Sequence, residues 1–204
     1  MASPAKQRIV EASSADITRL AQLIRDSFLE VAGRFKLTPQ NCPRHPSNYT
    51  SRWVKKDLAR GVRYFILIVD NAAVGCVGVE KAPQKTPPGR RAEKPGKTEH
   101  HNRTGRPASD DRNVLKDNLE VYMERLAVLP QHRGNGYGAR LAQHALREAK
   151  QMGAAIVGVG IIAADVGLKN FYQALGFEAC QTKHFPHLPF QVTFMRFDTQ
   201  LETS

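Results

Sequence analysis

The chain has too few cysteines to form a disulfide framework. Only three, Cys42, Cys76 and Cys180, occur in 204 residues, and they are widely spaced and odd in number. This usage argues against a small disulfide-stapled domain and favours a reducing compartment. Residues 1–8 also lack an apolar signal core, so we expect a cytoplasmic protein rather than a secreted one.

Long apolar runs and clustered metal ligands are missing as well. No apolar run reaches the length of a membrane-spanning helix, so we expect no membrane partner. No group of Cys and His residues has zinc-finger spacing, and His100 and His101 stand in a polar stretch without further ligands. The sequence therefore predicts neither a membrane protein nor a metal site.

Acidic residues are few compared with basic ones. The chain carries 30 Lys and Arg against 19 Asp and Glu, a net charge of +11, and such a balance is typical of nucleic-acid binding. However, the stretch from Lys81 to Lys116 holds ten of the basic and four of the acidic residues, and it has no Phe, Tyr or Trp to stack on bases. Nucleic-acid binding is therefore unfavoured, and the remaining positive charge can attract an anionic small ligand instead.

Apolar periodicity predicts an alternation of strands and helices. Ser13 and Asp16 are spaced as the start of a helix, with a carboxylate in its first turn. Helices are expected at about 14–32, 49–60, 136–152 and 166–175, and strands at about 8–12, 62–69, 74–80, 119–129, 155–162, 177–183 and 190–197. This order predicts an α/β (α+β) fold with a mixed, largely antiparallel central sheet of about seven strands, flanked by about four helices.

The length suits a single domain over residues 1–204 with a full core. Within it, residues 82–117 are rich in Pro, Gly, Lys and Arg and offer almost nothing to bury. Such a segment cannot offset the entropy lost on ordering. We interpret it as a flexible basic insertion between the third and fourth strands.

The most informative stretch follows the fourth expected strand and reads Arg133-Gly134-Asn135-Gly136-Tyr137-Gly138. A strand that turns through glycines into a helix forms an anion site, because the free N–H groups of the first helical turn point outward. The positive end of the helix dipole favours a phosphate there, and Arg133 would add a charged donor. The stretch therefore predicts a phosphorylated ligand.

Two common phosphate-binding motifs do not fit this stretch. The nucleoside-triphosphate loop needs Lys-Ser/Thr after its last glycine, whereas Ala139 and Arg140 follow here. The dinucleotide fingerprint needs Gly-x-Gly-x-x-Gly, and the spacing here is Gly-x-Gly-x-Gly. Gly158 and Gly160 with Ala163 fit that fingerprint by letter, but they lie inside an expected strand. Neither motif therefore explains the turn.

The turn and its surroundings resemble the GNAT superfamily of acyl-CoA-dependent N-acetyltransferases. The phrase Leu126-Ala127-Val128-Leu129-Pro130 precedes a match to Arg/Gln-x-x-Gly-x-Gly/Ala, and the later phrase Phe171–Phe177 matches Tyr-x-x-Leu-Gly-Phe. Two phrases in the right order are more specific than either alone. The resemblance covers about residues 7–80 and 118–197, and it implies a GNAT-like fold with acetyl-CoA as cosubstrate.

The resemblance also implies where the cosubstrate lies. In the family the fourth and fifth strands splay apart, and the pantetheine arm pairs with backbone groups that fall here at Leu126 and Val128. The pyrophosphate would bind at the turn formed by Arg133, Gly134, Asn135, Gly136, Tyr137 and Gly138. Where the family usually has an Asn that contacts this arm, the chain has Asp165, which cannot donate a hydrogen bond. Asn170 is the nearby candidate to replace it.

The resemblance assigns the chemistry to two further residues. Tyr172 stands where the family has the acid that protonates the leaving thiolate, although its ring could simply pack on the helix. Strand alternation places Tyr122, Glu124, Leu126 and Val128 on one face. Family members often have a carboxylate near the position of Glu124 that acts through water, so the resemblance makes Glu124 the candidate base. The alternative is that Glu124 only forms a salt bridge with a nearby arginine.

The acceptor pocket implied by the family is lined by two loops, here represented by Phe35 with residues 41–46 and by residues 183–190. His184 or His187 could accept a proton there, or these loops could merely cover the sheet edge. We expect an N-acetyltransferase that moves the acetyl group from acetyl-CoA to a primary amine of a small molecule or protein by direct attack. It would act as a monomer or homodimer. The alternative is a non-catalytic acyl-CoA-binding sensor or regulatory module.

Overall fold

The computed structural model describes residues 5–82 and 119–201. Its elements follow the expected order, and their ends differ from expectation by three residues or fewer. They are β1 (Gln7–Glu11), α1 (Ile17–Arg34), α2 (Ser51–Arg60), β2 (Arg63–Val69), β3 (Ala72–Lys81), β4 (Glu120–Val128), α3 (Tyr137–Gln151), β5 (Ile156–Ile162), α4 (Val166–Ala174), β6 (Glu178–His184) and β7 (Gln191–Asp198). The proposed insertion lies outside the described residues except for Ala82.

The seven strands form one sheet in the order β1-β2-β3-β4-β5-β7-β6. All neighbouring strands run antiparallel except β4 and β5, which run parallel. The predicted fold class is therefore confirmed. No helix in the described part of the chain is both long and apolar enough to cross a membrane.

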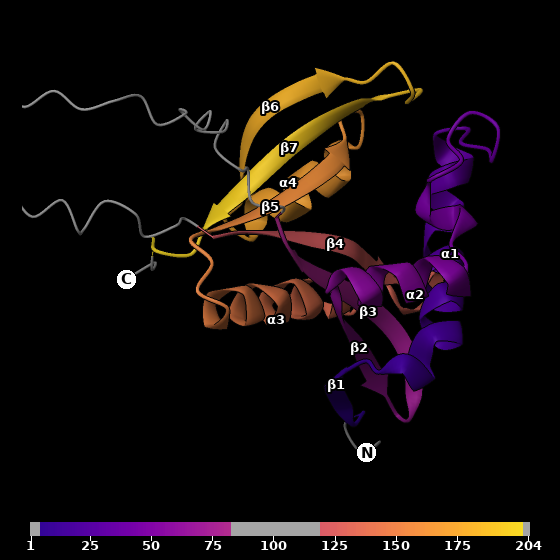
Figure 1. Cartoon of the computed structure of the whole chain (residues 1–204), viewed down its shortest axis with the longest axis vertical. Coiled ribbons are helices and arrows are strands. Elements are labelled where there is room, and N and C mark those ends of the chain that lie inside the picture. Colours follow the sequence, from indigo (N-terminus) through magenta and orange to yellow (C-terminus); the bar gives the residue numbers. More distant parts are fainter. Residues whose placement is uncertain (1–4, 83–118, 202–204) are drawn as a thin grey trace, which may run out of the picture. The chain divides into compact units, whose positions relative to one another are not determined.

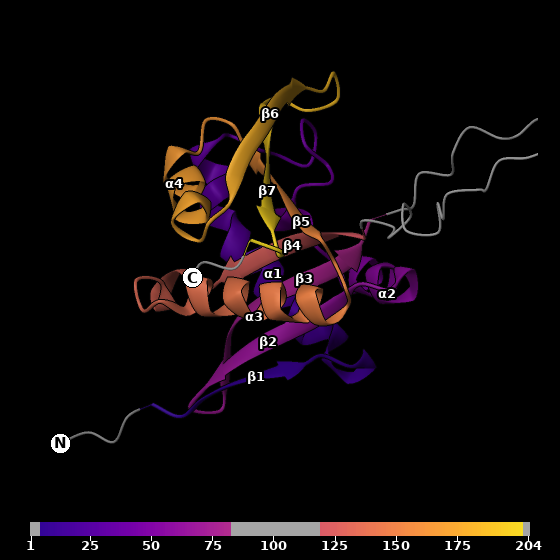
Figure 2. The same ribbon diagram turned by 90° about the vertical axis from the view of Figure 1, so that its left-hand side faces the viewer.

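The helices cover the two faces of the sheet and give it two cores (Figures 1 and 2). In Figure 2, α3 crosses in front of β2 and β3, whereas α1 and α2 lie behind. One core joins α3 and α4 to the sheet, and it contains Leu141, Ala145 and Tyr172. The other joins α1 and α2 to the opposite face, and it contains Leu20, Ile24 and Val54. Strand β4 contributes to both, so its residues can reach either side.

The helix ends follow from local sequence. Ser13 and Asp16 form the expected capping box: the Ser13 hydroxyl accepts from Ala15 N–H at 3.2 Å, and Asp16 accepts from Ser13 N–H at 3.0 Å. Gly61 and Gly176 follow α2 and α4 with φ of 94° and 91°, a conformation that residues with a Cβ rarely adopt. These signals explain why the helix positions could be read from sequence.

We propose that residues 83–116 are dispensable for the fold. The N–H of Ala82 donates to the carbonyl of Glu120 at 2.8 Å, and Lys81 pairs with Val121, so the two strand ends lie side by side. A short Gly-rich turn can therefore join them. Loop length enters closure entropy only logarithmically, so the free energy of unfolding in urea should change by about 1 kcal/mol or less. A larger loss would show that the segment packs on the domain.

Candidate active site

A pocket opens where β4 and β5 separate. The two strands pair only from Glu120 to Tyr122 on β4 and from Ile156 to Gly158 on β5, and beyond this point they diverge (Figure 1). The pocket has a volume of about 760 Å³ and is lined by α1, the α1–α2 loop, β4, β5, α4 and β7. This size is typical of small-molecule sites. Within the described residues, the β4 edge that faces the gap has no strand partner beyond Tyr122, so an amide-bearing ligand can pair with it as a strand would.

Strand β4 has a bulge just beyond the last residue that pairs with β5. Cys76 pairs with Ala127 and Gly78 with Glu124, so one residue of β3 faces two of β4, and Arg125 adopts a left-handed φ of 52°. A bulge bends its strand and shifts the alternation of side chains. The expectation that Glu124 and Leu126 share a face is therefore wrong.

Because of the bulge, Glu124 lies on one face of the sheet, and Leu126 and Val128 lie on the other. Met123 belongs to the core beneath α3 and α4, and Leu126 and Val128 pack against that core. Ala127 belongs to the core beneath α1 and α2, and Glu124 lies near Arg60 of α2. The pocket thus has an α4 side, with Leu126 and Val128, and an α1–α2 side, with Glu124.

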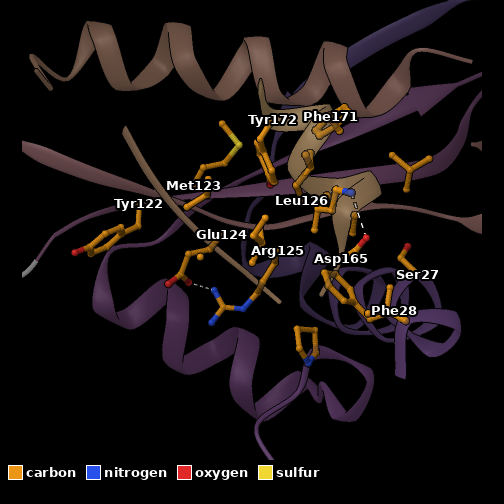
Figure 3. A pocket seen from close by; sticks show the side chains of 18 of the residues that line it. Ser27, Phe28, Tyr122, Met123, Glu124, Arg125, Leu126, Asp165, Phe171 and Tyr172 are labelled. Carbon is orange, nitrogen blue, oxygen red and sulfur yellow. Dashed lines mark hydrogen bonds and ion pairs between the residues drawn. The ribbon is translucent and has the colours of Figure 1, made fainter. Parts of the chain in front are cut away.

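Glu124 is ion-paired, as the alternative interpretation anticipated. Its carboxylate accepts from the Arg125 guanidinium (Figure 3), and Arg60 approaches it at 3.9 Å. Arg125 also lies 3.7 Å from buried Asp57 and over the ring of Tyr49. The paired carboxylate still lines the pocket, so the ion pair and a role as base are compatible.

Tyr172 lies on the α4 side of the pocket. It is buried, and its ring meets those of Phe171 and Phe177 edge-on at centroid distances of 5.2 Å each. Burial raises the pKa of the Tyr172 hydroxyl above its ordinary value, so the group keeps its proton at neutral pH. In Figure 3 its hydroxyl end points toward the Leu126 segment of β4. The side chain therefore both packs and presents a donor to the pocket.

The glycine turn lies at the start of α3. Gly134 and Gly136 have φ of 80° and 74°, and a Cβ added at either would meet no atom of residues 5–82 and 119–201 within 4 Å. Gly136 is the N-cap and supplies no side-chain acceptor, so the first N–H groups of α3 stay available for an anion. Asn135 instead donates to the carbonyls of His132 and Arg133, at 3.1 and 3.2 Å.

The last two residues of the turn pack rather than project outward. Tyr137 lies against the α3–α4 core, and an added Cβ at Gly138 would sit 3.6 Å from the Phe171 ring. Their backbone N–H groups are the part that can contact a phosphate. A small residue at 138 keeps α3 and α4 close together beside the pocket.

Arg133 makes several hydrogen bonds within the protein that the sequence does not predict. Its guanidinium donates to the carbonyl of Val128 at 3.2 Å, to the carbonyl of Ser27 at 2.7 Å and to Glu30 at 2.6 Å. It therefore ties the turn to α1 and also lines the pocket. A direct contact with the cosubstrate stays a prediction.

Asp165 caps α4 and lines the pocket. It is buried, accepts from Leu168 N–H at 3.2 Å and forms an ion pair with Arg34 of α1 (Figure 3). Its carboxylate is thus committed to these two partners. Asn170 is exposed and does not belong to the pocket lining, so its contact with the cosubstrate stays a prediction that the geometry does not support.

Only one of the two expected acceptor loops reaches the pocket. Arg44 and Pro46 of the α1–α2 loop line it, whereas none of residues 183–190 does. Leu188 and Phe190 pack instead with Phe35 against Ala32, Leu37 and Cys42. The expected lining by residues 183–190 is therefore wrong, and Phe194 of β7 takes that place.

The arrangement holds a proton donor on one side of a gap and a carboxylate on the other. Tyr172 can protonate a leaving group that lies along β4, and Glu124 can accept a proton, directly or through water, from a nucleophile that enters from the α1–α2 side. Sequence reasoning missed Arg125, which pairs with Glu124 and approaches Asp57, and it missed Arg34, which pairs with Asp165. No sequence signal marks them, because their partners lie elsewhere in the chain or depend on the bulge.

Comparisons with known proteins agree with this geometry. Residues 29–177 match the family model described as the acetyltransferase (GNAT) family. A search of curated protein sequences found no significant match. Three solved structures are similar in fold, although sequence identity is low. The paia N-acetyltransferase of Thermoplasma acidophilum in complex with coenzyme A has a TM-score of 0.64 and 12% identity, and the match covers 95% of this chain and 99% of that one. The ribosomal-protein-S18-alanine N-acetyltransferase of Escherichia coli has a TM-score of 0.62 and 12% identity, with 95% of this chain and 94% of that one covered. The structure of yncA from Salmonella typhimurium with its cofactor acetyl-CoA has a TM-score of 0.60 and 15% identity, with 97% of this chain and 96% of that one covered.

Proposed function

The chain belongs to the GNAT acetyltransferase family, and from this premise we propose that it transfers the acetyl group of acetyl-CoA directly to a primary amine. The observation that carries the proposal is the gap between β4 and β5, which runs beside the glycine turn and is flanked by Tyr172 and Glu124. A pantetheine arm fits such a gap, because its amides can pair with the free edge of β4. Its pyrophosphate would bind at the start of α3.

The cosubstrate would place its thioester near Leu126 and Val128. The amine nitrogen then attacks the thioester carbonyl carbon, and the oxyanion that develops is stabilised by a backbone N–H, for which Val128 is the candidate. As the C–S bond breaks, the electron pair goes to sulfur, and Tyr172 supplies the proton that makes the free thiol. The products are the N-acetylated amine and CoA.

The amine must lose a proton before or during its attack, because only the neutral form is nucleophilic. Glu124 is the proposed acceptor of this proton, directly or through water. Its ion pair with Arg125 holds the carboxylate in place before the acceptor arrives. The alternative function, a sensor that binds acyl-CoA without turnover, predicts that acyl-CoA binds at the same gap but that no acetylated amine forms.

The test is a screen of amine acceptors with purified full-length protein and acetyl-CoA, followed through the release of free thiol. We expect at least one amine to raise thiol release well above the rate without acceptor. Tight binding of acetyl-CoA with no acceptor-dependent release across small-molecule and peptide amines would favour the sensor alternative. No binding of acetyl-CoA would reject the proposed function altogether.

A further inference from the structure

Among the described residues, one positively charged side chain that lines the pocket has no ion-pair partner. Arg34 pairs with Asp165, and Arg133 pairs with Glu30. Arg44 also lines the pocket and is exposed, yet within residues 5–82 and 119–201 it makes no hydrogen bond and no ion pair. It is the pocket-lining arginine whose charge these residues do not neutralise.

The loop around Arg44 is held firmly. Cys42 and His45 on either side of it are buried, and His45 N–H donates to the carbonyl of Cys42 at 3.0 Å. The Asn48 amide donates to the carbonyls of Cys42 and Pro43 at 3.3 and 3.4 Å. The backbone that carries the Arg44 guanidinium is therefore largely fixed before any ligand binds, which reduces the entropy lost on binding.

The neighbouring histidine does not add to this positive charge. The Nδ1 atom of His45 accepts the N–H of Ser47 at 3.3 Å and lies 2.9 Å from the Ser47 hydroxyl. Burial lowers the pKa of His45, which favours the neutral ring at pH 7. Arg44 thus supplies the positive charge of this loop segment.

A cluster of carboxylates and arginines beside the pocket has one more negative than positive charge among the described residues. Asp57, Glu80 and Glu124 share two guanidinium groups, those of Arg60 and Arg125. The tyrosines in contact with Asp57, Tyr49 and Tyr64, keep their protons, because burial raises the pKa of both. Three carboxylates therefore face two cations among the described residues.

This negative charge reaches the pocket at Glu124. The side chain of Glu124 is 29% exposed, whereas those of Asp57 and Glu80 are 4% and 14% exposed. Glu124 also lines the pocket, on the same α1–α2 side as Arg44. The two unbalanced charges, one of each sign, therefore border the space in which the acceptor would bind.

We propose that the acceptor is an amine that also carries an anionic group, a carboxylate or a phosphate. Its ammonium would bind beside Glu124 before deprotonation, and its anionic group would bind the Arg44 guanidinium. Arginine suits both kinds of anion, because its N–H donors match carboxylate and phosphate geometry. Complementary charges of this kind determine which partner is accepted more than how tightly it binds. This inference rests on the proposed acetyl transfer.

The test compares matched acceptors in the thiol-release assay. Each amino acid is paired with its α-amide, and phosphoethanolamine with ethanolamine, which separates carboxylate from phosphate. We expect the anionic member of at least one type of pair to have the higher kcat/KM, by about tenfold or more. Arg44→Gln should bring the ratio of kcat/KM for the anionic member to that for the neutral member close to one, because KM for the anionic member rises. Arg44→Lys should keep part of the preference for the anionic member.

Arg52→Gln is the matched control. Arg52 is exposed on α2 and does not belong to the pocket lining, so its loss should leave the ratio unchanged. Neutral amines that react as well as or better than their anionic partners would overturn the inference while leaving acetyl transfer intact, as would an Arg44→Gln protein with an unchanged ratio. Failure of every amine to release thiol would reject the inference together with the proposed function.

Discussion

Replacement of Gly136 with aspartate is expected to abolish acetyl-CoA binding in a protein that still folds. Gly136 has a φ of 74°, and its missing side chain would project into open space at the start of α3. A carboxylate about 5 Å from one phosphate charge costs about 3 kcal/mol at an effective dielectric constant of about 20, which raises Kd more than about 100-fold. Titration calorimetry with acetyl-CoA measures this change.

Gly136→Asn separates charge from backbone strain. Asparagine has nearly the same size as aspartate, and both tolerate the left-handed conformation better than most residues. Thermal unfolding should therefore be similar for the two variants, while the asparagine variant should keep much more of the acetyl-CoA affinity. Equal affinities for the aspartate variant and the unmodified protein would move the pyrophosphate site away from this turn.

Replacement of Tyr172 with phenylalanine is expected to lower kcat about 100-fold or more while acetyl-CoA affinity changes little. The substitution keeps the ring contacts with Phe171 and Phe177, and among the described residues no hydrogen bond of the hydroxyl is lost. Stability should therefore stay close to that of the unmodified protein. Tyr122→Phe, which removes another hydroxyl from the pocket wall, is the control and should slow turnover far less.

The pH dependence of kcat gives a second readout for Tyr172. The acid acts in its protonated form, so activity should fall as pH rises through the pKa of Tyr172. Because burial raises this pKa, the fall should come above the ordinary tyrosine value of about 10 and not near neutrality. Tyr172→Phe should lose this limb. A variant that turns over at the native rate would assign the proton to water or to another residue.

Much of the fold could be read from the sequence because its determinants are local. The capping box at Ser13 and Asp16, and the glycines that follow α2 and α4, mark helix ends within a few residues. The turn at Gly134 and Gly136 needs glycine for its positive φ, so it is recognisable without any tertiary contact.

The parts of the site that were predicted wrongly or not predicted depend on the strand bulge and on contacts between residues far apart in the sequence. The left-handed φ of Arg125 has no signature in the sequence, yet it moves Leu126 to the face opposite Glu124. The ion pair between Arg34 and Asp165 joins residues 131 positions apart. Packing of Leu188 onto the end of α1 removes its loop from the pocket. Such contacts become visible only once the sheet is assembled.

The most direct test of acetyl transfer is mass spectrometry of a reaction with isotopically labelled acetyl-CoA and the best amine from the screen. Direct attack predicts one labelled acetyl group on the amine nitrogen for each thiol released, and no labelled protein when the acceptor is left out. Thiol release without an acetylated amine, or an acetylated protein that passes its label to the amine, would contradict transfer in a single step from acetyl-CoA to the acceptor.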